Sequence, residues 1–254
     1  MKNKFKIIGL ILTILILWQL IYLVFNIQSS LIPSPIIIFQ TFVELIFDGE
    51  IFIHILNSLL RVVVGFLIAT FVALVLSMVF GVFRKTGELF KPIIEILRPI
   101  PPIAWIPIAI IIFGLGNNSA YFIVFLGAFF PIFTNSYFGV LSLPNICKNV
   151  SATFELKKIV FLFKILIPFS LPFIFTGLRI GMGMAWMSVI AAELIGAQSG
   201  LGYFIQISRL LLQTDNIIVG MIIIGLVGYL LIKVIDIFEY ILIPWNRKNY
   251  VAIK

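Results

Sequence analysis

Residues 161–196 read FLFKILIPFSLPFIFTGLRIGMGMAWMSVIAAELIG. A basic stretch containing Pro168 and Pro172 leads into an apolar, glycine-rich segment whose one carboxylate is Glu193. About 20 apolar helical residues suffice to cross the ~30 Å hydrocarbon core of a membrane. The stretch therefore predicts a membrane-spanning helix that continues from a loop on the membrane surface, and this helix sets the class of the fold.

The composition of the whole chain is that of a membrane protein. Of its 254 residues, 62% are hydrophobic and 11% are charged, whereas about a quarter of the residues in ordinary globular domains are charged. Six apolar runs have roughly the length of a span; they cover 7–25, 57–80, 90–113, 119–140, 172–195 and 217–243. They leave only short loops and no room for a soluble catalytic domain. The sequence thus predicts an all-α, polytopic integral membrane protein with about six transmembrane helices, and not an enzyme.

The runs divide the chain into an N-terminal span with an external loop and a short interfacial helix, a core with a long cytoplasmic loop, and a tail. These parts cover 1–56, 57–245 (with the loop at 141–171) and 246–254. The short helix is expected over 36–47, because Ser34 can cap it with Pro35 at its first position. The last span is expected to begin after a cap at Asp215 or Asn216.

The basic residues predict the orientation of the loops. With the N-terminus inside, every Lys and Arg except Arg61 and Arg209 falls on the inner side, and the outer loop 26–56 has none. Both termini are therefore predicted to be cytoplasmic, in a multi-pass protein of the cell membrane. The net charge of +8 follows from this topology and gives no reason to expect nucleic acid as a partner.

The third apolar run is interrupted by the sequence RPIPP at 98–102. From Pro102 to Phe113 a helix would cover only about 18 Å, too short to cross a membrane. The segment must therefore recruit residues 90–97 and be bent or broken between. Irregular backbone at membrane depth is tolerated only where protein or a water-filled cavity surrounds it. The break is either the inner wall of a pathway or a kink packed among other helices.

The fifth run contains both small and charged residues. Gly177 and Gly181 form a GxxxG pattern, which is typical of helix–helix contact, and Gly183 continues the small face. Arg179 lies near the inner end and can extend its guanidinium group to the interface. Glu193 lies about 21 Å farther along the helix, too far to pair with Arg179. In the last run, the spacing of Lys233 and Asp236 permits an ion pair.

The sequence contains none of the patterns that carry catalysis or metal binding. Cys147 and His54 each stand alone, so we expect no disulfide and no metal site. No phosphate-binding loop occurs either. Energy for uphill transport must therefore come from a partner or from an ion gradient. An ion-coupled transporter generally has several ionisable groups in its spans, and Glu193 is nearly the only such group expected here, which favours an external motor.

Several segments in order resemble a known family, the permease subunits of nitrate/sulfonate/taurine-type ABC importers. The most specific are IPPIAWIP (100–107) and AELIG with GLGY (192–203). The others are an LPSP-like element (31–35), NSLLRVVVGF (57–66), FLGAFFPIF (125–133) and TGLRIGMGMAW (176–186). The resemblance covers nearly the whole chain and implies a type I ABC importer permease fold. It also implies a second permease copy, expected as a homodimer, two ATPase subunits that bind the ATP, and an extracytoplasmic solute-binding protein.

In this family, a cytoplasmic loop between two spans couples the permease to the ATPase. Its pattern is EAA, three residues, Gly, nine residues, then I-x-L-P. The Ile165–Pro168 segment places the Glu at Asn149, the two Ala at Val150 and Ser151, and the Gly at Glu155. Spacing is kept although residues differ, and Glu155 is expected to extend a helix where Gly would allow a turn. The residues expected to contact the ATPase are Asn149, Val150, Ser151, Phe154, Glu155, Leu156, Lys157 and Lys158.

The resemblance therefore implies an ATP-driven importer subunit for a small, anionic solute such as a sulfonate, taurine or nitrate, and we expect it to be held in membrane lipid and to have no cofactor of its own. The residues expected along the translocation pathway are Pro101, Pro102, Trp105, Trp186, Ser188 and Glu193. Glu193 either gates the outer end or hydrogen-bonds a neighbouring helix. Two other classes remain open: a self-sufficient ion-coupled secondary transporter or channel, and a membrane scaffold that moves no solute.

Overall fold

The computed structural model describes residues 2–24 and 32–246, and over these ranges the chain is helical without any strand. The expectations for the tail 246–254 and for loop residues 26–31 lie outside the described residues, Asn246 excepted. The all-α class predicted from the sequence is confirmed. The elements in chain order are α1 (Lys2–Val24), α2 (Pro35–Asp48), α3 (Glu50–Val82), α4 (Arg84–Leu97), the 3₁₀ turn η1 (Pro102–Trp105), α5 (Ile106–Phe113), α6 (Asn117–Leu141), α7 (Asn145–Thr153), α8 (Lys158–Phe161), the π-helical turn η2 (Leu162–Leu166), α9 (Ile167–Gly196), α10 (Leu201–Leu210), α11 (Thr214–Leu242) and η3 (Pro244–Asn246).

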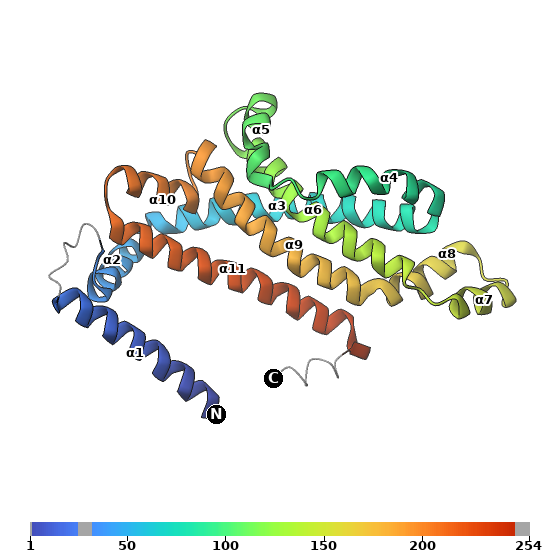
Figure 1. Cartoon of the computed structure of the whole chain (residues 1–254), viewed down its shortest axis with the longest axis horizontal. Helices are drawn as coiled ribbons and strands as arrows, with labels where there is room; N and C mark the ends of the chain where they lie inside the picture. Colours follow the sequence, from blue (N-terminus) through green and yellow to red (C-terminus); the bar gives the residue numbers. More distant parts are fainter. Residues whose placement is uncertain (1, 25–31, 247–254) are drawn as a thin grey trace.

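Four helical stretches in the described part are long and apolar enough to cross a membrane: α3, α6, Lys158–Gly196 (which ends in α9) and α11. They lie along the long axis of the molecule, with α6 packed between α3 and α9, and α11 against α9 (Figure 1). A fifth crossing exists if α4 and the η1–α5 segment form one broken span, and α1 contains a shorter apolar helix, Leu12–Val24. Together these helices account for the six apolar runs of the sequence.

The third apolar run is broken where the sequence predicted an interruption. Helix α4 ends at Leu97, and the η1–α5 segment that starts at Pro102 is turned by 87° from it. Proline has no backbone N–H and disfavours helical conformation in the residue before it. In Figure 1 α4 lies along the main bundle, whereas α5 projects away from it.

The close packing of α6 against α9 depends on glycine. A Cβ at Gly177 would lie 3.0 Å from the Asn135 Cβ and 3.1 Å from the Pro131 carbonyl oxygen, and one at Gly181 would lie 2.7 Å from Ile132. Small residues let two helix backbones approach closely in a membrane. Gly183, expected on the same face, has open space instead, since nothing lies within 4 Å of its Cβ position. Two residues correspond to about 200° around a helix, so Gly183 faces away from α6.

The N-terminal part packs on one end of this bundle. As predicted, Ser34 caps α2: its Oγ accepts a hydrogen bond from the Ile37 N–H at 3.3 Å. The cap predicted for the last span is wrong, because α11 begins at Thr214 after Gln213. Asp215 lies in the first turn of α11, where its carboxylate accepts a hydrogen bond from the Thr41 hydroxyl of α2 at 2.9 Å. Asp215 therefore links two helices rather than starting one.

Candidate functional site

A buried charged cluster lies where α3, α9 and α10 meet. The Glu193 carboxylate, on α9, is 2.8 Å from Nη1 of Arg61 on α3, and the side chains are 0% and 6% exposed. The Ser58 hydroxyl, one turn before Arg61, lies 2.8 and 2.9 Å from the two carboxylate oxygens. The Gly202 N–H donates to Oε2 at 3.0 Å. An ion pair without water is stable only when its remaining hydrogen-bonding groups are also satisfied, as they are here.

The same cluster caps the N-terminus of α10. The first N–H groups of a helix have no partner within the helix. Here the Gly200 N–H donates to Nδ1 of His54 at 3.1 Å and the Leu201 N–H donates to the Ser58 hydroxyl at 2.9 Å, while the Gly202 N–H reaches the carboxylate. A negative charge at a helix N-terminus is favourable electrostatically. Three side chains from two other helices therefore fix where α10 begins.

Arg61 also ties down the turn between α9 and α10. Its Nη1 and Nη2 donate to the Ser199 carbonyl and hydroxyl oxygens at 2.5 and 2.8 Å. Its Nε donates to the Asn117 side chain at the start of α6, also at 2.8 Å. The sequence expectation that Glu193 is nearly the only ionisable group in the spans is wrong. Arg61 is a buried residue of α3, and no periodic pattern in the sequence marks it as the partner of Glu193.

A second charged cluster joins α9 to α11 nearer the other end. Arg179 pairs with Asp236, with Nε and Oδ1 2.8 Å apart, and with Glu239. Lys233 Nζ lies 3.2 Å from Asp236, so the pair predicted from spacing is confirmed. Arg179 is 37% exposed. It reaches the neighbouring helix rather than only the interface, so α9 and α11 are linked by charge at this end.

The loop between α6 and α9 contains the two short helices α7 and α8 at one end of the molecule (Figure 1). The expectation that Glu155 extends a helix is wrong. Helix α7 ends at Thr153, and Glu155 has a left-handed backbone with φ 48°. The N–H groups of Glu155 and Leu156 donate to the Ala152 and Ser151 carbonyls at 3.0 and 3.1 Å, a Schellman pattern that usually places Gly where Glu155 stands. The turn that Gly provides in the family pattern is thus kept without Gly.

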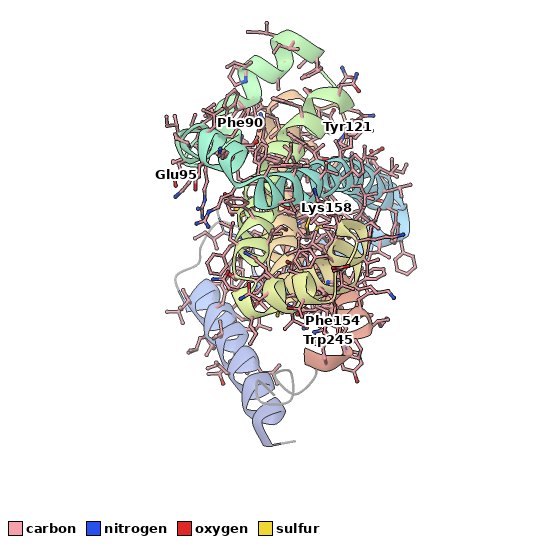
Figure 2. All side chains as sticks on the ribbon, turned by 90° about the vertical axis from the view of Figure 1, so that its right-hand side faces the viewer. Phe90, Glu95, Tyr121, Phe154, Lys158 and Trp245 are labelled. Carbon is pink, nitrogen blue, oxygen red and sulfur yellow. The ribbon has the colours of Figure 1, made fainter. Side chains whose placement is uncertain are left out.

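The residues expected to contact an ATPase lie on the outside of this loop, with one exception. Phe154 is 73% exposed and Val150 49% exposed. Asn149, Glu155, Leu156, Lys157 and Lys158 are also exposed. Ser151 is buried and donates its hydroxyl to the Cys147 carbonyl at 2.6 Å. Figure 2 looks onto this end of the molecule and labels Phe154 and Lys158.

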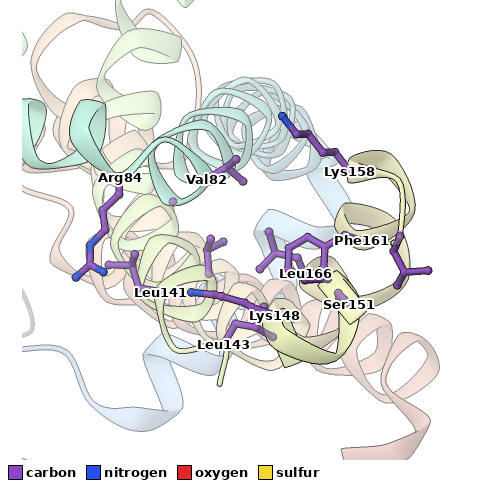
Figure 3. A pocket seen from close by; sticks show the side chains of 13 residues that line it. Val82, Arg84, Leu141, Leu143, Lys148, Ser151, Lys158, Phe161 and Leu166 are labelled. Atoms are coloured by element: carbon purple, nitrogen blue, oxygen red, sulfur yellow. The ribbon is translucent and has the colours of Figure 1, made fainter. Parts of the chain in front are cut away.

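A cavity of about 500 Å³ lies between this loop and the ends of α3 and α6. Figure 3 shows Lys148 extending along one side of it toward Leu141, and Lys158 at the opposite rim. The side chains of Ser151 and Leu156 face it from the loop. The expected contact residues therefore divide into an outer surface and an inner, cavity-lining set.

The residues expected along a pathway do not line one common route in this conformation. Trp186 is buried, donates its indole N–H to the Ile224 carbonyl at 3.0 Å and lies against Gly228, so it packs α9 on α11. Ser188 is buried against Gly127 of α6. Trp105 is half-buried beside a separate apolar cluster. Glu193 belongs to the buried cluster described above.

Of that set, Pro102 is the residue that lines one of the three cavities described for residues 32–246. This cavity, of about 250 Å³, lies between the broken span, α6 and α9. Pro101, beside it in sequence, is exposed. Arg98, Thr134 and Asn135 supply polar lining, and Arg98 and Thr134 also line an adjoining cavity of about 270 Å³. Arg98, whose side chain has no ion pair among the described residues, was not singled out from the sequence.

The fold and these sites define a multi-pass membrane protein with a broken span and an exposed helical loop at one end. The chain belongs to the family described as binding-protein-dependent transport system inner membrane component, whose model matches residues 65–248. The resemblance expected from the sequence is therefore confirmed: the chain is a permease subunit of the ABC transporter class, and not an enzyme.

Known proteins similar to the chain agree with this family. It is 34% identical over 247 residues to the nitrate import permease protein NrtB of Synechocystis, covering 94% of this chain and 89% of that protein. An ABC transporter permease of Methanocaldococcus jannaschii is 37% identical over 237 residues, 91% of this chain and 88% of that protein. The methionine ABC transporter MetNI, solved in inward-facing conformations, contains a chain of similar fold with a TM-score of 0.61 and 18% identity, over 77% of this chain and 98% of that one.

Proposed function

We propose that the chain is the membrane subunit of an ATP-driven importer and that the α7–α8 loop docks onto a separate ATPase. The observation that carries this is the set of large apolar side chains exposed on the loop. Ile146, Phe154 and Ile159 are 69%, 73% and 65% exposed at the end of the bundle rather than along its sides. Contiguous exposed apolar surface marks an interaction site. The proposed docking loop lies within residues 141–171, and the core that it serves is 57–245.

The orientation follows from the same end of the molecule. Arg84, Lys148 and Lys158 lie together around one cavity there, and basic residues concentrate on the cytoplasmic side of membrane proteins. The α7–α8 end is therefore the cytoplasmic end, and we place both termini inside. The solute then arrives at the opposite end from an external binding protein.

The solute is proposed to be a small anion that passes the broken span. The cavity lined by Pro102 contains one charged residue, Arg98, and no carboxylate among its lining residues. Charged groups in membrane spans generally face a water-filled cavity and mark ion or substrate pathways. The family relatives named for nitrate fit an anionic cargo. Trp105, Trp186, Ser188 and Glu193 then act by holding the helices around this route in place.

A second copy of the chain is the proposed partner for α5. This helix projects from the body of the molecule (Figure 1), and Ile111 and Ile112 on it are 82% and 63% exposed. Neither side chain is covered within one copy. A homodimer would bury this face at the centre of the membrane, beside the broken span, and lipid would cover the remaining apolar surface.

An ion-coupled transporter working alone is the second candidate, because the spans contain more ionisable groups than the sequence suggested. The clusters around Glu193 and Arg179 are of the kind that carries protons in pumps. In both, however, the carboxylates are paired with arginine. Paired groups serve to link helices, and the ATP-driven function remains the better supported.

The test is capture of a candidate ABC ATPase subunit by the purified chain in nanodiscs. Replacing residues 150–157 by a Gly/Ser linker is expected to abolish capture, and Phe154→Ala to weaken it at least tenfold. Phe47→Ala is the matched control, because Phe47 is 85% exposed and belongs to α2, which lies at the opposite end of the bundle (Figure 1). Glu155→Gly is expected to retain capture, since it keeps the left-handed turn.

Transport separates the two candidates. With the ATPase and binding protein reconstituted in liposomes, uptake of nitrate or of an alkanesulfonate should require ATP and should fall in Arg98→Gln. Arg209→Gln, an exposed arginine at the far end of α10, should leave uptake unchanged. Uptake driven by an ion gradient without ATP would overturn the proposal. No uptake under any condition would point to a scaffold.

A further inference from the structure

The cavity beneath the α7–α8 loop differs from the other two in both size and charge. It has a volume of about 500 Å³ and lies where α3 and α6 end and α9 begins. Those helix ends place it at the level where a span leaves the hydrocarbon core. The cavity is therefore expected at the depth of the lipid headgroups.

Three cations line this cavity and no carboxylate does. They are Arg84 at the start of α4, Lys148 on α7 and Lys158 on α8. Figure 3 shows them on different sides of the cavity. The one acidic neighbour with a described contact is Glu88, whose carboxylate lies 3.4 Å from Arg84 on the exposed face of α4. The two lysines have no ion pair among the described residues, so their charge is not neutralised by a carboxylate of the described chain, whereas that of Arg84 is shared with Glu88.

The remaining lining is apolar. Val82 and Val140 come from the ends of α3 and α6, and Leu143, Phe161 and Leu166 come from the loop and its return to α9. Leu143 and Leu166 belong to a small apolar cluster of buried residues with Val140. A cationic rim around an apolar floor suits a molecule with an anionic head and a hydrocarbon tail.

We propose that this cavity binds an anionic phospholipid of the inner leaflet, with its phosphate between Lys148, Lys158 and Arg84 and the start of an acyl chain against the apolar floor. Basic pockets between helices at the cytoplasmic side are suited to anionic headgroups. A free phosphate has no apolar group that could pack against the apolar floor. An acidic protein segment would suit the charges, but its polar backbone would be costly to bury against the apolar floor.

Such a lipid would bridge the loop to the spans. Lys148 and Lys158 belong to α7 and α8, whereas Arg84 begins α4, and Val82 and Val140 of the apolar floor lie at the ends of α3 and α6. Occupancy would therefore fix the position of the loop relative to the bundle. The proposal does not rest on solute import, and lipid binding can be measured on the permease alone.

The test is native mass spectrometry of the purified chain titrated with phosphatidylglycerol or phosphatidylcholine in mixed micelles. The wild-type chain is expected to bind one phosphatidylglycerol in preference to phosphatidylcholine. Each lysine near an anionic headgroup contributes about a fivefold gain in binding. The double variant Lys148→Gln/Lys158→Gln should therefore lose about 25-fold in affinity for phosphatidylglycerol.

The matched control is Lys157→Gln/Lys164→Gln, two exposed lysines of the same loop that do not line the cavity. This variant changes the net charge equally and should keep its affinity for phosphatidylglycerol.

An equal loss of that affinity in both double variants would mean general surface attraction and would overturn the proposal. Equal affinity for soluble glycerol phosphate, which lacks the acyl chain, would overturn the assignment to a lipid. Loss of ATPase capture in Lys148→Gln/Lys158→Gln with unchanged lipid binding would assign the cations to the protein partner instead.

Discussion

The two arginine–carboxylate clusters of the bundle differ in how completely they are removed from solvent. At one end, Arg61 and Glu193 have side chains 6% and 0% exposed, and serine, asparagine and backbone groups fill their remaining hydrogen-bonding positions. At the other, Arg179 is 37% exposed and pairs with Asp236 and Glu239. Both clusters link spans that are far apart in sequence. Only the first also caps a helix and fixes a turn.

The difference shows what burial demands of a charge. Without water, a charge that loses its partner remains uncompensated, so a buried pair is costly to break even where its net contribution is small. In a half-exposed pair, water can solvate the charge that remains when its partner is lost, and salt screens the attraction between the two charges. The cluster around Glu193 should therefore act as a rigid joint between α3, α9 and α10, and that around Arg179 as an adjustable link between α9 and α11.

The largest effect is expected from Arg61→Ala. It leaves the Glu193 carboxylate buried without its cation and frees the Ser199 turn, at a cost of about 3–5 kcal/mol in the free energy of unfolding. The measurement is the midpoint temperature of thermal unfolding in detergent. The folded fraction at each temperature is taken from size-exclusion chromatography. Arg61→Ala combined with Glu193→Ala should cost less than the sum of the two. Strict additivity would show that the pair is not coupled.

Gly200→Ala should cause the second largest loss in the free energy of unfolding, because it disturbs the turn between α9 and α10 beside the same Glu193 cluster. Gly200 has φ 108°, and a Cβ there would collide with the Glu193 carboxylate. Left-handed strain and a disturbed hydrogen-bond network together should cost about 2–4 kcal/mol. The matched control is Gly49→Ala, since Gly49 also has a positive φ of 77° but has nothing within 4 Å of its Cβ position. Equal unfolding midpoints for the two variants would contradict a special role for the cluster.

Arg179→Ala should have a smaller effect, about 1–3 kcal/mol, because Asp236 is 22% exposed and keeps Lys233 as a partner, so that only Glu239 is left buried without its cation. Salt distinguishes it further. Between 0.1 and 1 M the screening length falls from about 10 to about 3 Å. High salt should therefore reduce the difference in unfolding midpoint between the wild type and Arg179→Ala. The difference in midpoint between the wild type and Arg61→Ala should stay nearly unchanged. The same response to salt in both would remove the distinction between the clusters.

The smallest effect is expected from Lys233→Ala. Lys233 is 49% exposed, lies 3.2 Å from Asp236 and has its Nζ 5.5 Å from the centre of the Tyr229 ring. An exposed pair contributes at most about 1 kcal/mol, and Asp236 keeps Arg179 in the variant. The unfolding midpoint should stay close to that of the wild type. A loss as large as that of Arg179→Ala would mean that the lysine, rather than the arginine, holds this end together.

Much of the fold could be predicted from local pattern. The apolar runs, the break at RPIPP and the Ser34 cap each depend on neighbouring residues in the sequence, and each was found. The turn at Glu155 was predicted wrongly, because the residue type favours a helix whereas the hydrogen bonds of the helix end favour a left-handed residue. Arg98 and Lys148 were visible in the sequence only as basic residues, since a cavity is made by helices from several parts of the chain.

Hydrophobic length, proline position and motif spacing are local properties, and they sufficed to predict a helical membrane protein of the ABC permease family. Which charges meet depends instead on how the helices pack. Arg61 and Glu193 are 132 residues apart, and Arg179 and Asp236 are 57 apart. The packing of α3, α6, α9 and α11 brings them together, and no periodicity along one helix encodes a partner on another.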